Sequence, residues 1–249
     1  LNCFIGNNGA GKTNLMDAIY YLSFCKSFLN PVDGQNIRFD QEFFMIQGRY
    51  SRLESDETIY CGLKRNQKKI VKRNQKEYKK LSEHIGLIPL IVVTPSDTNL
   101  ITGGSEERRR FIDSVISQYD AVYLEALIRY NRALQQRNNL LKQFAANNAF
   151  NLETVEIWDD QLVKYGRQIH AVRKTFIENL QPIFQKYYQL ISGGKEIVGL
   201  KHQSDLTDQD FDQLLKDSVG KDRMLQYTTT GIHKDDFEFE LAGYPIRKF

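Results

Sequence analysis

The sequence lacks several features that define whole classes of protein. None of its apolar runs approaches the roughly 20 residues that a membrane-spanning helix needs, which excludes a transmembrane protein. It has three cysteines, Cys3, Cys25 and Cys61, which lie far apart and form no C-x-x-C pair. A disulfide framework and a zinc ribbon are therefore both unsupported, and a reducing, cytoplasmic environment is expected.

Histidine is equally scarce, with four residues among 249. His84, His170 and His202 are isolated along the chain, and no two of them have the spacing of metal ligands. The sequence therefore predicts no metal site made of protein side chains alone. With 41% hydrophobic and 26% charged residues, the composition is that of a globular protein and excludes a disordered chain.

The net charge of +3 is distributed unevenly. Residues 64–80 contain nine basic side chains and one acid, a local charge of +8, whereas the rest of the chain has 25 basic and 30 acidic residues. Lysine and arginine supply most of the sequence-independent affinity for DNA, so this basic segment is a candidate DNA contact. The candidate residues are Lys64, Arg65, Lys68, Lys69, Lys72 and Arg73. A solvated hairpin whose outward side chains are basic explains the same pattern.

Apolar periodicity predicts strands and a helix in the first part of the chain. The run at 1–5 precedes glycines and is typical of a buried strand, and helical spacing follows from 13 to about 24. Short apolar runs from 43 to 73, divided by polar turns, indicate antiparallel hairpins. The densest aliphatic run, 87–94, predicts a central strand that begins after Pro89.

The second part of the chain is mainly helical. Two long amphipathic helices are separated by a polar break at 146–151, and the second is interrupted at Pro182, which suggests an antiparallel helical arm. Trp158 is expected to anchor the core of this arm. Alternating residues at 237–241 predict a further strand. The predicted division is a mixed-sheet lobe I at 1–101, a helical lobe II at 102–192 and a return to lobe I at 193–249.

A phosphate-binding loop is the strongest motif in the sequence. Residues 6–13 match G-x-x-x-x-G-K-[ST] at every fixed position, between a predicted strand and a predicted helix. Glycines let successive backbone N–H groups curl around a phosphate, and the helix adds its positive dipole end. Lysine then reaches the β- and γ-phosphates, and the threonine hydroxyl binds Mg²⁺. The candidate nucleotide ligands are Gly6, Asn7, Asn8, Gly9, Ala10, Gly11, Lys12 and Thr13, with Thr13 also the Mg²⁺ ligand.

Four stretches together resemble one family. The segment TNLMDAI at 13–19 resembles the ABC-type ATPase heads of SMC-like and recombination proteins. GSEERRRFID at 104–113, YNRALQQRNNLLK at 130–142 and TGIHKDD at 230–236 are similar, in the same order, to segments of the RecF family of bacterial DNA replication and repair proteins. The resemblance covers nearly the whole chain.

This resemblance implies an α/β fold: a P-loop ABC/SMC-like ATPase head with a helical insertion. It also implies ATP and Mg²⁺ as cofactors, an ATP-dependent homodimer, binding to double-stranded and gapped DNA, and recombinase loading with the RecO and RecR mediators. The family's signature and Walker B motifs follow the position of Phe249, and the chain reads as an internal segment of a longer protein. We therefore expect weak nucleotide binding without hydrolysis here, and a weak DNA-dependent ATPase in the full-length protein.

Consecutive arginines are a further candidate. Arg108, Arg109 and Arg110 fan over about 200° of a helix and cannot all face one partner. We expect one to pair with Asp113, one to meet DNA or the other subunit, and one to be solvated.

Two other residues are candidates on weaker grounds. Asp97 follows the predicted strand at the position where ABC-type heads sense the γ-phosphate and Mg²⁺, although a helix cap or an Asx turn explains it too. His233 is placed by the resemblance near the nucleotide or the dimer face, whereas a simple turn explains its acidic neighbours. The alternative function is a P-loop nucleotide switch whose helical arm docks a protein partner without DNA contact.

Overall fold

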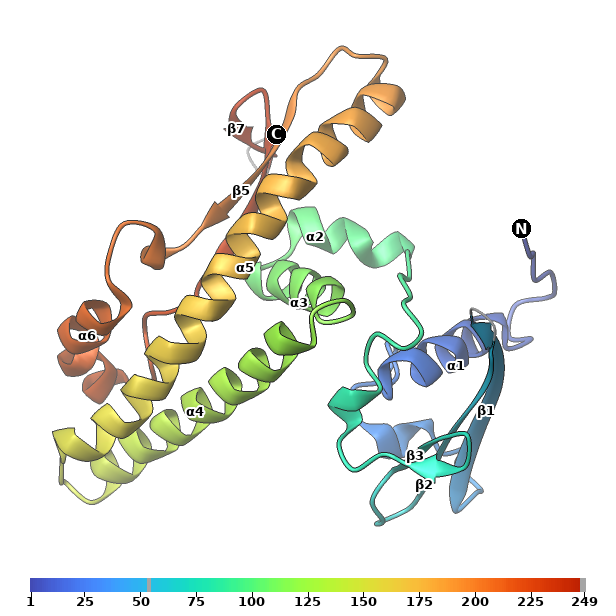
Figure 1. The fold of residues 1–249 in the computed structure, drawn as a ribbon, viewed down its shortest axis with the longest axis horizontal. Coiled ribbons are helices and arrows are strands. Elements are labelled where there is room, and N and C mark those ends of the chain that lie inside the picture. Colours follow the sequence, from blue (N-terminus) through green and yellow to red (C-terminus); the bar gives the residue numbers. More distant parts are fainter. Residues whose placement is uncertain (53–54, 247–249) are drawn as a thin grey trace. The chain divides into compact units, whose positions relative to one another are not determined.

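The computed structural model describes residues 1–52 and 55–246. The chain divides into two compact units, Leu1–Val92 (unit 1) and Val93–Phe249 (unit 2), which are described separately (Figure 1). The predicted three-part division at 1–101, 102–192 and 193–249 stays a prediction. Among the described residues, no helix combines the length and apolar character that a membrane crossing requires.

Unit 1 is one helix packed on a four-stranded antiparallel sheet of order β1-β2-β3-β4. Its elements are α1 (Lys12–Phe24), β1 (Phe43–Arg52), β2 (Ser55–Lys64), β3 (Ile70–Arg73) and β4 (Lys76–Glu77), with 3₁₀ turns at Asp33–Asn36 and Leu81–Glu83. The core is formed by Tyr21 and Leu22 of α1 with Ile59, Cys61 and Val71 of the sheet. Because Ile59 and Cys61 are two apart, both point to the helix-covered face. The predicted helix and antiparallel hairpins are confirmed.

Unit 2 combines a helical hairpin with a three-stranded antiparallel sheet of order β5-β6-β7. Its helices are α2 (Asn99–Thr102), α3 (Ser105–Ile116), α4 (Ala121–Ala146), α5 (Leu152–Ser192) and α6 (Phe211–Leu225). Its strands are β5 (Val198–Gln203), β6 (Asp236–Leu241) and β7 (Tyr244–Pro245), and 3₁₀ turns occupy Pro95–Thr98 and Asp205–Thr207.

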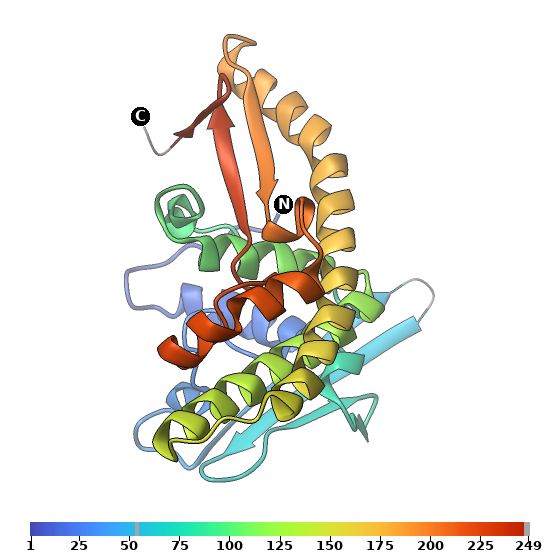
Figure 2. The ribbon, with the colours of Figure 1, turned by 90° about the vertical axis from the view of Figure 1, so that its left-hand side faces the viewer.

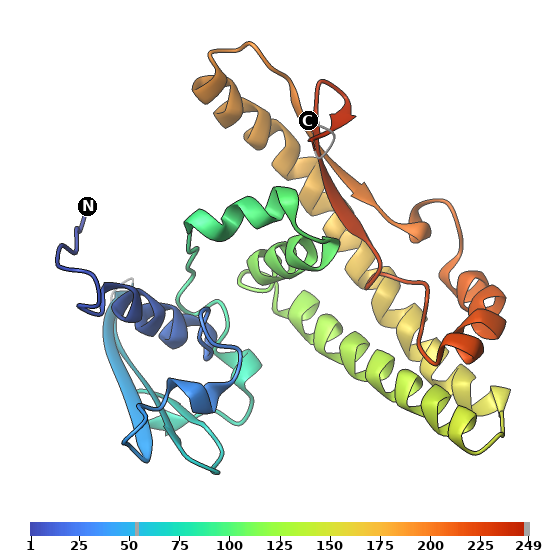
Figure 3. The same cartoon turned by 180° about the vertical axis from the view of Figure 1, so that it is seen from behind.

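The two long helices run antiparallel, as predicted for the arm (Figure 3). Side chains cap both N-termini: Asp120 accepts from the Tyr123 N–H (2.8 Å), and Asn151 accepts from the Thr154 N–H (3.0 Å). Trp158 packs against the core, which confirms its predicted role.

The predicted interruption at Pro182 is wrong, because α5 continues through it to Ser192. The C-terminal part of α5 lies alongside the β5–β6 pair (Figure 2). Gln181 accepts from the Leu200 N–H (2.7 Å), and Gln185 accepts from the Val198 N–H (2.9 Å). These bonds hold the last turns of α5 to the edge of β5, which offsets the backbone bond that proline removes.

Two predicted strands, 1–5 and 87–94, are also wrong. Neither segment pairs with another strand within the described residues. Ile5 is 92% exposed and Val93 is 82% exposed. An apolar run indicates a tendency to be buried, but a strand forms only where a neighbouring strand satisfies its backbone N–H and C=O groups.

A buried ion cluster ties three helices of unit 2 together. Arg137 of α4 donates to Asp159 of α5 (2.5 Å), to Asp222 of α6 (2.6 Å) and to the Thr228 hydroxyl (3.0 Å). Burial is the main cause that raises the pKa of Asp159, and the Arg137 charge opposes it. Because the guanidinium is completely buried, losing both acids would leave its charge unmatched, and losing either one removes a hydrogen-bond acceptor.

Candidate functional site

The loop at 6–13 has the backbone of a phosphate-binding turn. Gly9 and Gly11 have φ values of 84° and 88°, in the left-handed region that side chains rarely adopt. No atom lies within 4 Å of a Cβ built on either glycine, so conformation and not space requires glycine here. Gly11 is the N-cap of α1 and supplies no side-chain cap, and the first turn has no acidic residue. The N-terminus of α1 therefore keeps unmatched N–H groups and the positive dipole end that attract an anion.

Lys12 lies over this loop. Its ammonium group donates to the carbonyl oxygens of Gly6 (2.6 Å) and Asn7 (2.8 Å), and neither bond is buried. Thr13 is exposed in the first turn of α1. The structure thus brings residues 6–13 together at one helix terminus, with a cation already held at the loop.

A recess of about 960 Å³ opens beside the same helix terminus in unit 1. Asn14 lines it from α1, and Arg38, Phe39 and Arg65 line it from the segments before β1 and after β2. Phe39 is fully exposed, so an aromatic face is available to a ligand.

The basic segment divides into internal and exposed cations. Lys69 donates to Asp33 and to the Tyr21 hydroxyl, and Arg73 forms a salt bridge with buried Glu57. Arg65 donates to the Gln41 carbonyl (3.1 Å) and the Arg38 carbonyl (3.4 Å). Lys64 and Lys68 are exposed, and Lys72 is half-buried with its ammonium 5.7 Å from the centre of the Tyr60 ring. Of the DNA-binding candidates, Lys64, Arg65 and Lys68 are thus exposed and Lys72 is half-buried, whereas Lys69 and Arg73 are held in ion pairs.

The three arginines of α3 make three different contacts. Arg108 is buried and holds the Asp236 carboxylate with two bonds (2.7 and 3.0 Å), while Arg109 donates to the Asp235 carbonyl. Arg110 pairs with Glu106 (2.7 Å) at the surface. The segments 104–113 and 230–236, each similar to RecF, therefore bind one another through Arg108 and Arg109.

The expected pairing of one of these arginines with Asp113 is wrong. Asp113 instead accepts from Arg173 of α5 (2.9 and 3.0 Å) and from the Tyr123 hydroxyl. Arg173 is 1% exposed and also donates to Asp235 (2.9 Å) and to the Ile232 carbonyl (2.8 Å). A partner 60 residues away leaves no periodic signal in the sequence, which explains the error.

His233 forms two hydrogen bonds within unit 2. Its Nε2 donates to the Thr228 carbonyl (3.0 Å), so its Nδ1 accepts from the Tyr130 hydroxyl (2.8 Å). Burial lowers the pKa of His233 to about 4, and the Lys234 and Arg109 charges lower it further while the Thr228 bond opposes the shift. The ring is therefore neutral at pH 7. Its expected place near the nucleotide or a dimer face stays a prediction.

Asp97 has the contacts of a helix cap. Its carboxylate accepts from the Thr94 N–H (2.7 Å) and hydroxyl (3.2 Å), while the Asp97 N–H donates to the Thr94 carbonyl (3.0 Å). This capping box starts the 3₁₀ turn Pro95–Thr98. A role toward γ-phosphate stays a prediction for Asp97.

Sequence reasoning missed one cluster. His170 and His202 are not isolated: their ring centres lie 5.2 Å apart, and Asp235 completes a group whose ligand atoms lie within 4.8 Å of one another. No local spacing could have indicated this, because the fold of unit 2 brings together residues from α5, from β5 and from the position immediately before β6.

Comparisons with known proteins agree with this architecture. Residues 1–240 match the family described as "AAA domain, putative AbiEii toxin, Type IV TA system". The DNA replication and repair protein RecF of Flavobacterium johnsoniae is 49% identical over 249 residues, which are all of this chain and 69% of that protein. RecF of Bacteroides fragilis is 51% identical over 249 residues and is covered to 66%. The chain thus spans about two thirds of the length of these relatives.

Comparison with solved structures identifies the same family. A structure of the recombination mediator protein RecF with ATPrS, in the RecFOR pathway, has a TM-score of 0.90 and 29% identity. The match covers 98% of this chain and 68% of that one. A structure of RecF with ATP also has a TM-score of 0.90 and 29% identity. The chain belongs to the RecF family of DNA replication and repair proteins and has the ABC/SMC-like ATPase head fold of that family.

Proposed function

We propose that residues 6–13 bind ATP together with Mg²⁺. One observation carries this proposal: a glycine loop, an uncapped helix N-terminus and the Lys12 ammonium group coincide at one place. On binding, Lys12 exchanges the carbonyl oxygens of Gly6 and Asn7 for phosphate oxygens, and the Thr13 hydroxyl becomes a Mg²⁺ ligand. The similarity to RecF structures with ATP and ATPrS supports this assignment.

The recess beside Asn14 supports it further, because it offers about 960 Å³ next to the phosphate loop for the rest of the nucleotide. Ligand pockets commonly occupy about 300–1,000 Å³. The phosphate loop would fix the charged end, and Arg38 and Phe39 would line the other.

Titration with a fluorescent ATP analogue tests the ATP proposal. Lys12→Ala removes charge-assisted hydrogen bonds worth about 1.5–3 kcal/mol, so the affinity should fall about 10- to 100-fold. Lys195→Ala, an exposed lysine of unit 2, is the matched control and should leave the affinity unchanged. Equal affinity of Lys12→Ala and the unmodified chain would refute the proposal.

We propose further that the protein contacts double-stranded and gapped DNA through the exposed part of the basic segment. A polar recess on the sheet supports this surface, since Arg49, Tyr60 and Lys72 line it together. Lysine and arginine bind phosphates, and Tyr60 supplies an aromatic ring beside them. The DNA repair proteins to which the chain is similar favour this over the switch that docks a protein without DNA.

The remaining proposals rest on the family. We infer that the full-length protein dimerises when ATP is bound and works with RecO and RecR to load a recombinase. The naming of two similar structures as a recombination mediator in the RecFOR pathway supports this inference.

A further inference from the structure

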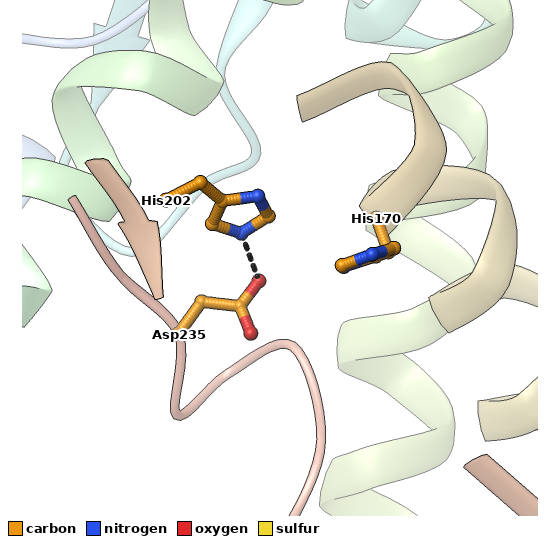
Figure 4. Close-up of side chains that lie close together, drawn as sticks. All are labelled: His170, His202 and Asp235. Atoms are coloured by element: carbon orange, nitrogen blue, oxygen red, sulfur yellow. Dashed lines mark hydrogen bonds and ion pairs between the residues drawn. The ribbon is translucent and has the colours of Figure 1, made fainter. Parts of the chain in front are cut away.

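Three potential metal ligands converge on one side of α5. His170 lies on α5, His202 on β5, and Asp235 immediately before β6 (Figure 4). His202 Nε2 lies 3.0 Å from Asp235 Oδ2, and His170 lies across from this pair with its ring centre 5.2 Å from that of His202. One donor atom from each residue lies within 4.8 Å of the other two.

The group is fixed in place by its surroundings. The His202 ring stacks on Phe237 with ring centres 4.9 Å apart, which limits its rotation. Arg173 donates to Asp235 Oδ2 at 2.9 Å and so orients the carboxylate. A hydrogen bond to a ligating carboxylate from a neighbouring side chain is a regular feature of protein metal sites.

His170 has an unmet hydrogen-bonding atom at the same place. Among the described residues, its Nδ1 is buried and has no hydrogen-bond partner. A neutral imidazole keeps a lone pair for a metal ion, which is the form that binds metals.

We propose that His170, His202 and Asp235 bind one divalent transition-metal ion of the zinc class. Two imidazoles and one carboxylate suit zinc and its neighbours, whereas Mg²⁺ and Ca²⁺ require mainly oxygen ligands. Zinc–ligand bonds of about 2.0–2.1 Å set tetrahedral donors roughly 3.3 Å apart, so the side chains must close by about 1.5 Å. His202 Nε2 and Asp235 Oδ2 are already 3.0 Å apart, so rotation of the His170 side chain toward this pair supplies the movement, and water completes the coordination.

The bound ion would cross-link α5 to the β5–β6 pair. In metal-free protein these elements are joined near this point by the His202–Asp235 contact and by Arg173. A metal ion exchanges the hydrogen bond between His202 and Asp235 for two coordinate bonds and adds His170. Zinc should therefore raise the melting temperature of the protein in a concentration-dependent way, because it binds the folded state.

The test uses the full-length protein without nucleotide, stripped with a chelator and titrated with Zn²⁺ alone. We expect about one tightly held zinc ion per chain, retained in the presence of millimolar Mg²⁺. X-ray absorption at the zinc edge on the unmodified protein should count two imidazole ligands and no sulfur. Retention of no zinc, or coordination that includes sulfur or lacks the two imidazoles, would overturn the proposal.

Matched variants locate the ion. His170→Gln and His202→Gln should each abolish stoichiometric zinc retention, while Cys3→Ser, which removes an exposed thiol elsewhere, should not change it. Circular dichroism checks that each variant is folded, and the absorption measurement stands without any variant. Zinc retained by either histidine variant would show that the ion lies elsewhere.

Discussion

The ammonium group of Lys69 lies 2.6 Å from the Asp33 carboxylate, inside unit 1, although Lys69 belongs to the most basic segment of the chain. It also donates to the Tyr21 hydroxyl (3.3 Å) and to the Cys25 carbonyl. All three ammonium protons thus have acceptors in the protein, and the side chain is only 11% exposed. Lys69 therefore holds the loop after α1 to the turn that precedes β3 and is unsuited to bind a phosphate.

Lys64 and Lys68, which are exposed, and the half-buried Lys72 should carry the DNA affinity of the basic segment. The triple variant Lys64→Glu, Lys68→Glu and Lys72→Glu should weaken binding to duplex DNA by at least about tenfold, because each phosphate contact contributes through counterion release. Each lost contact should also reduce the slope of log affinity against log salt by about 0.9. Fluorescence anisotropy over a series of salt concentrations measures both quantities.

A triple variant of equal charge change is the control for that experiment. Lys142, Lys186 and Lys195 are exposed lysines of unit 2, and their reversal to glutamate should alter the salt slope little. If both triple variants lowered the slope equally, net charge and not this surface would determine binding. If neither did so, the switch that docks a protein without DNA would become the better explanation.

Features of the fold that depend on neighbouring residues could be predicted from the sequence, whereas features that depend on distant contacts could not. The glycine-rich turn before α1 and the helix itself are confirmed, because their signal lies within consecutive residues, while phosphate binding at the turn stays a prediction. The hairpins and the helical arm also have local periodicity, and the structure has both. The prediction of strands at 1–5 and 87–94 was wrong, because an apolar run does not indicate whether a partner strand is available.

The ion network and the histidine cluster could not be predicted by the same means. Arg173 and Asp113 are 60 residues apart, and nothing near either residue identifies the other. The sequence made the three arginines of α3 candidates for contact with DNA or with another subunit. In the structure, Arg108 and Arg109 instead bind the 230–236 segment of the same chain. Composition identified the basic segment, but only the structure shows that Lys69 is held in an internal ion pair while Lys68 is exposed.

His233 should make the stability of the protein depend on pH. Its pKa is about 4 in the folded state, against 6.5 for an ordinary histidine. The unfolded chain therefore binds more protons, and the stabilising effect of the neutral ring, complete above pH 6.5, is lost as pH falls toward 4. In urea unfolding, the unmodified protein should lose about 2–3 kcal/mol over this window from His233.

His233→Gln isolates this effect. The variant should be less stable at pH 7.5, because bonds to Tyr130 and Thr228 are lost, yet its disadvantage should shrink toward pH 4.5. Tyr130→Phe removes one hydrogen-bond partner but keeps the titrating ring, so it should retain most of the pH dependence. A stability difference between His233→Gln and the unmodified protein that does not vary with pH would contradict the assignment.

Arg173 should be among the side chains on which unit 2 depends most. Its guanidinium is buried between Asp113 and Asp235, so Arg173→Met leaves two carboxylates without their cation and should cost about 3–5 kcal/mol of the free energy of unfolding. Arg110→Met, which breaks only the exposed pair with Glu106, is the matched control and should cost less than about 1 kcal/mol.

A double-mutant cycle then separates the ion pair from simple loss of packing. Asp113→Asn removes the charge that Arg173→Met would leave unpaired, so the double variant should be more stable than the sum of the two single changes by about 0.5–3 kcal/mol. Urea unfolding of all four proteins at pH 7.5 measures this coupling energy. Strict additivity would mean that Arg173 and Asp113 are not coupled, and that Arg173 stabilises unit 2 through Asp235, the Ile232 carbonyl and its packed volume.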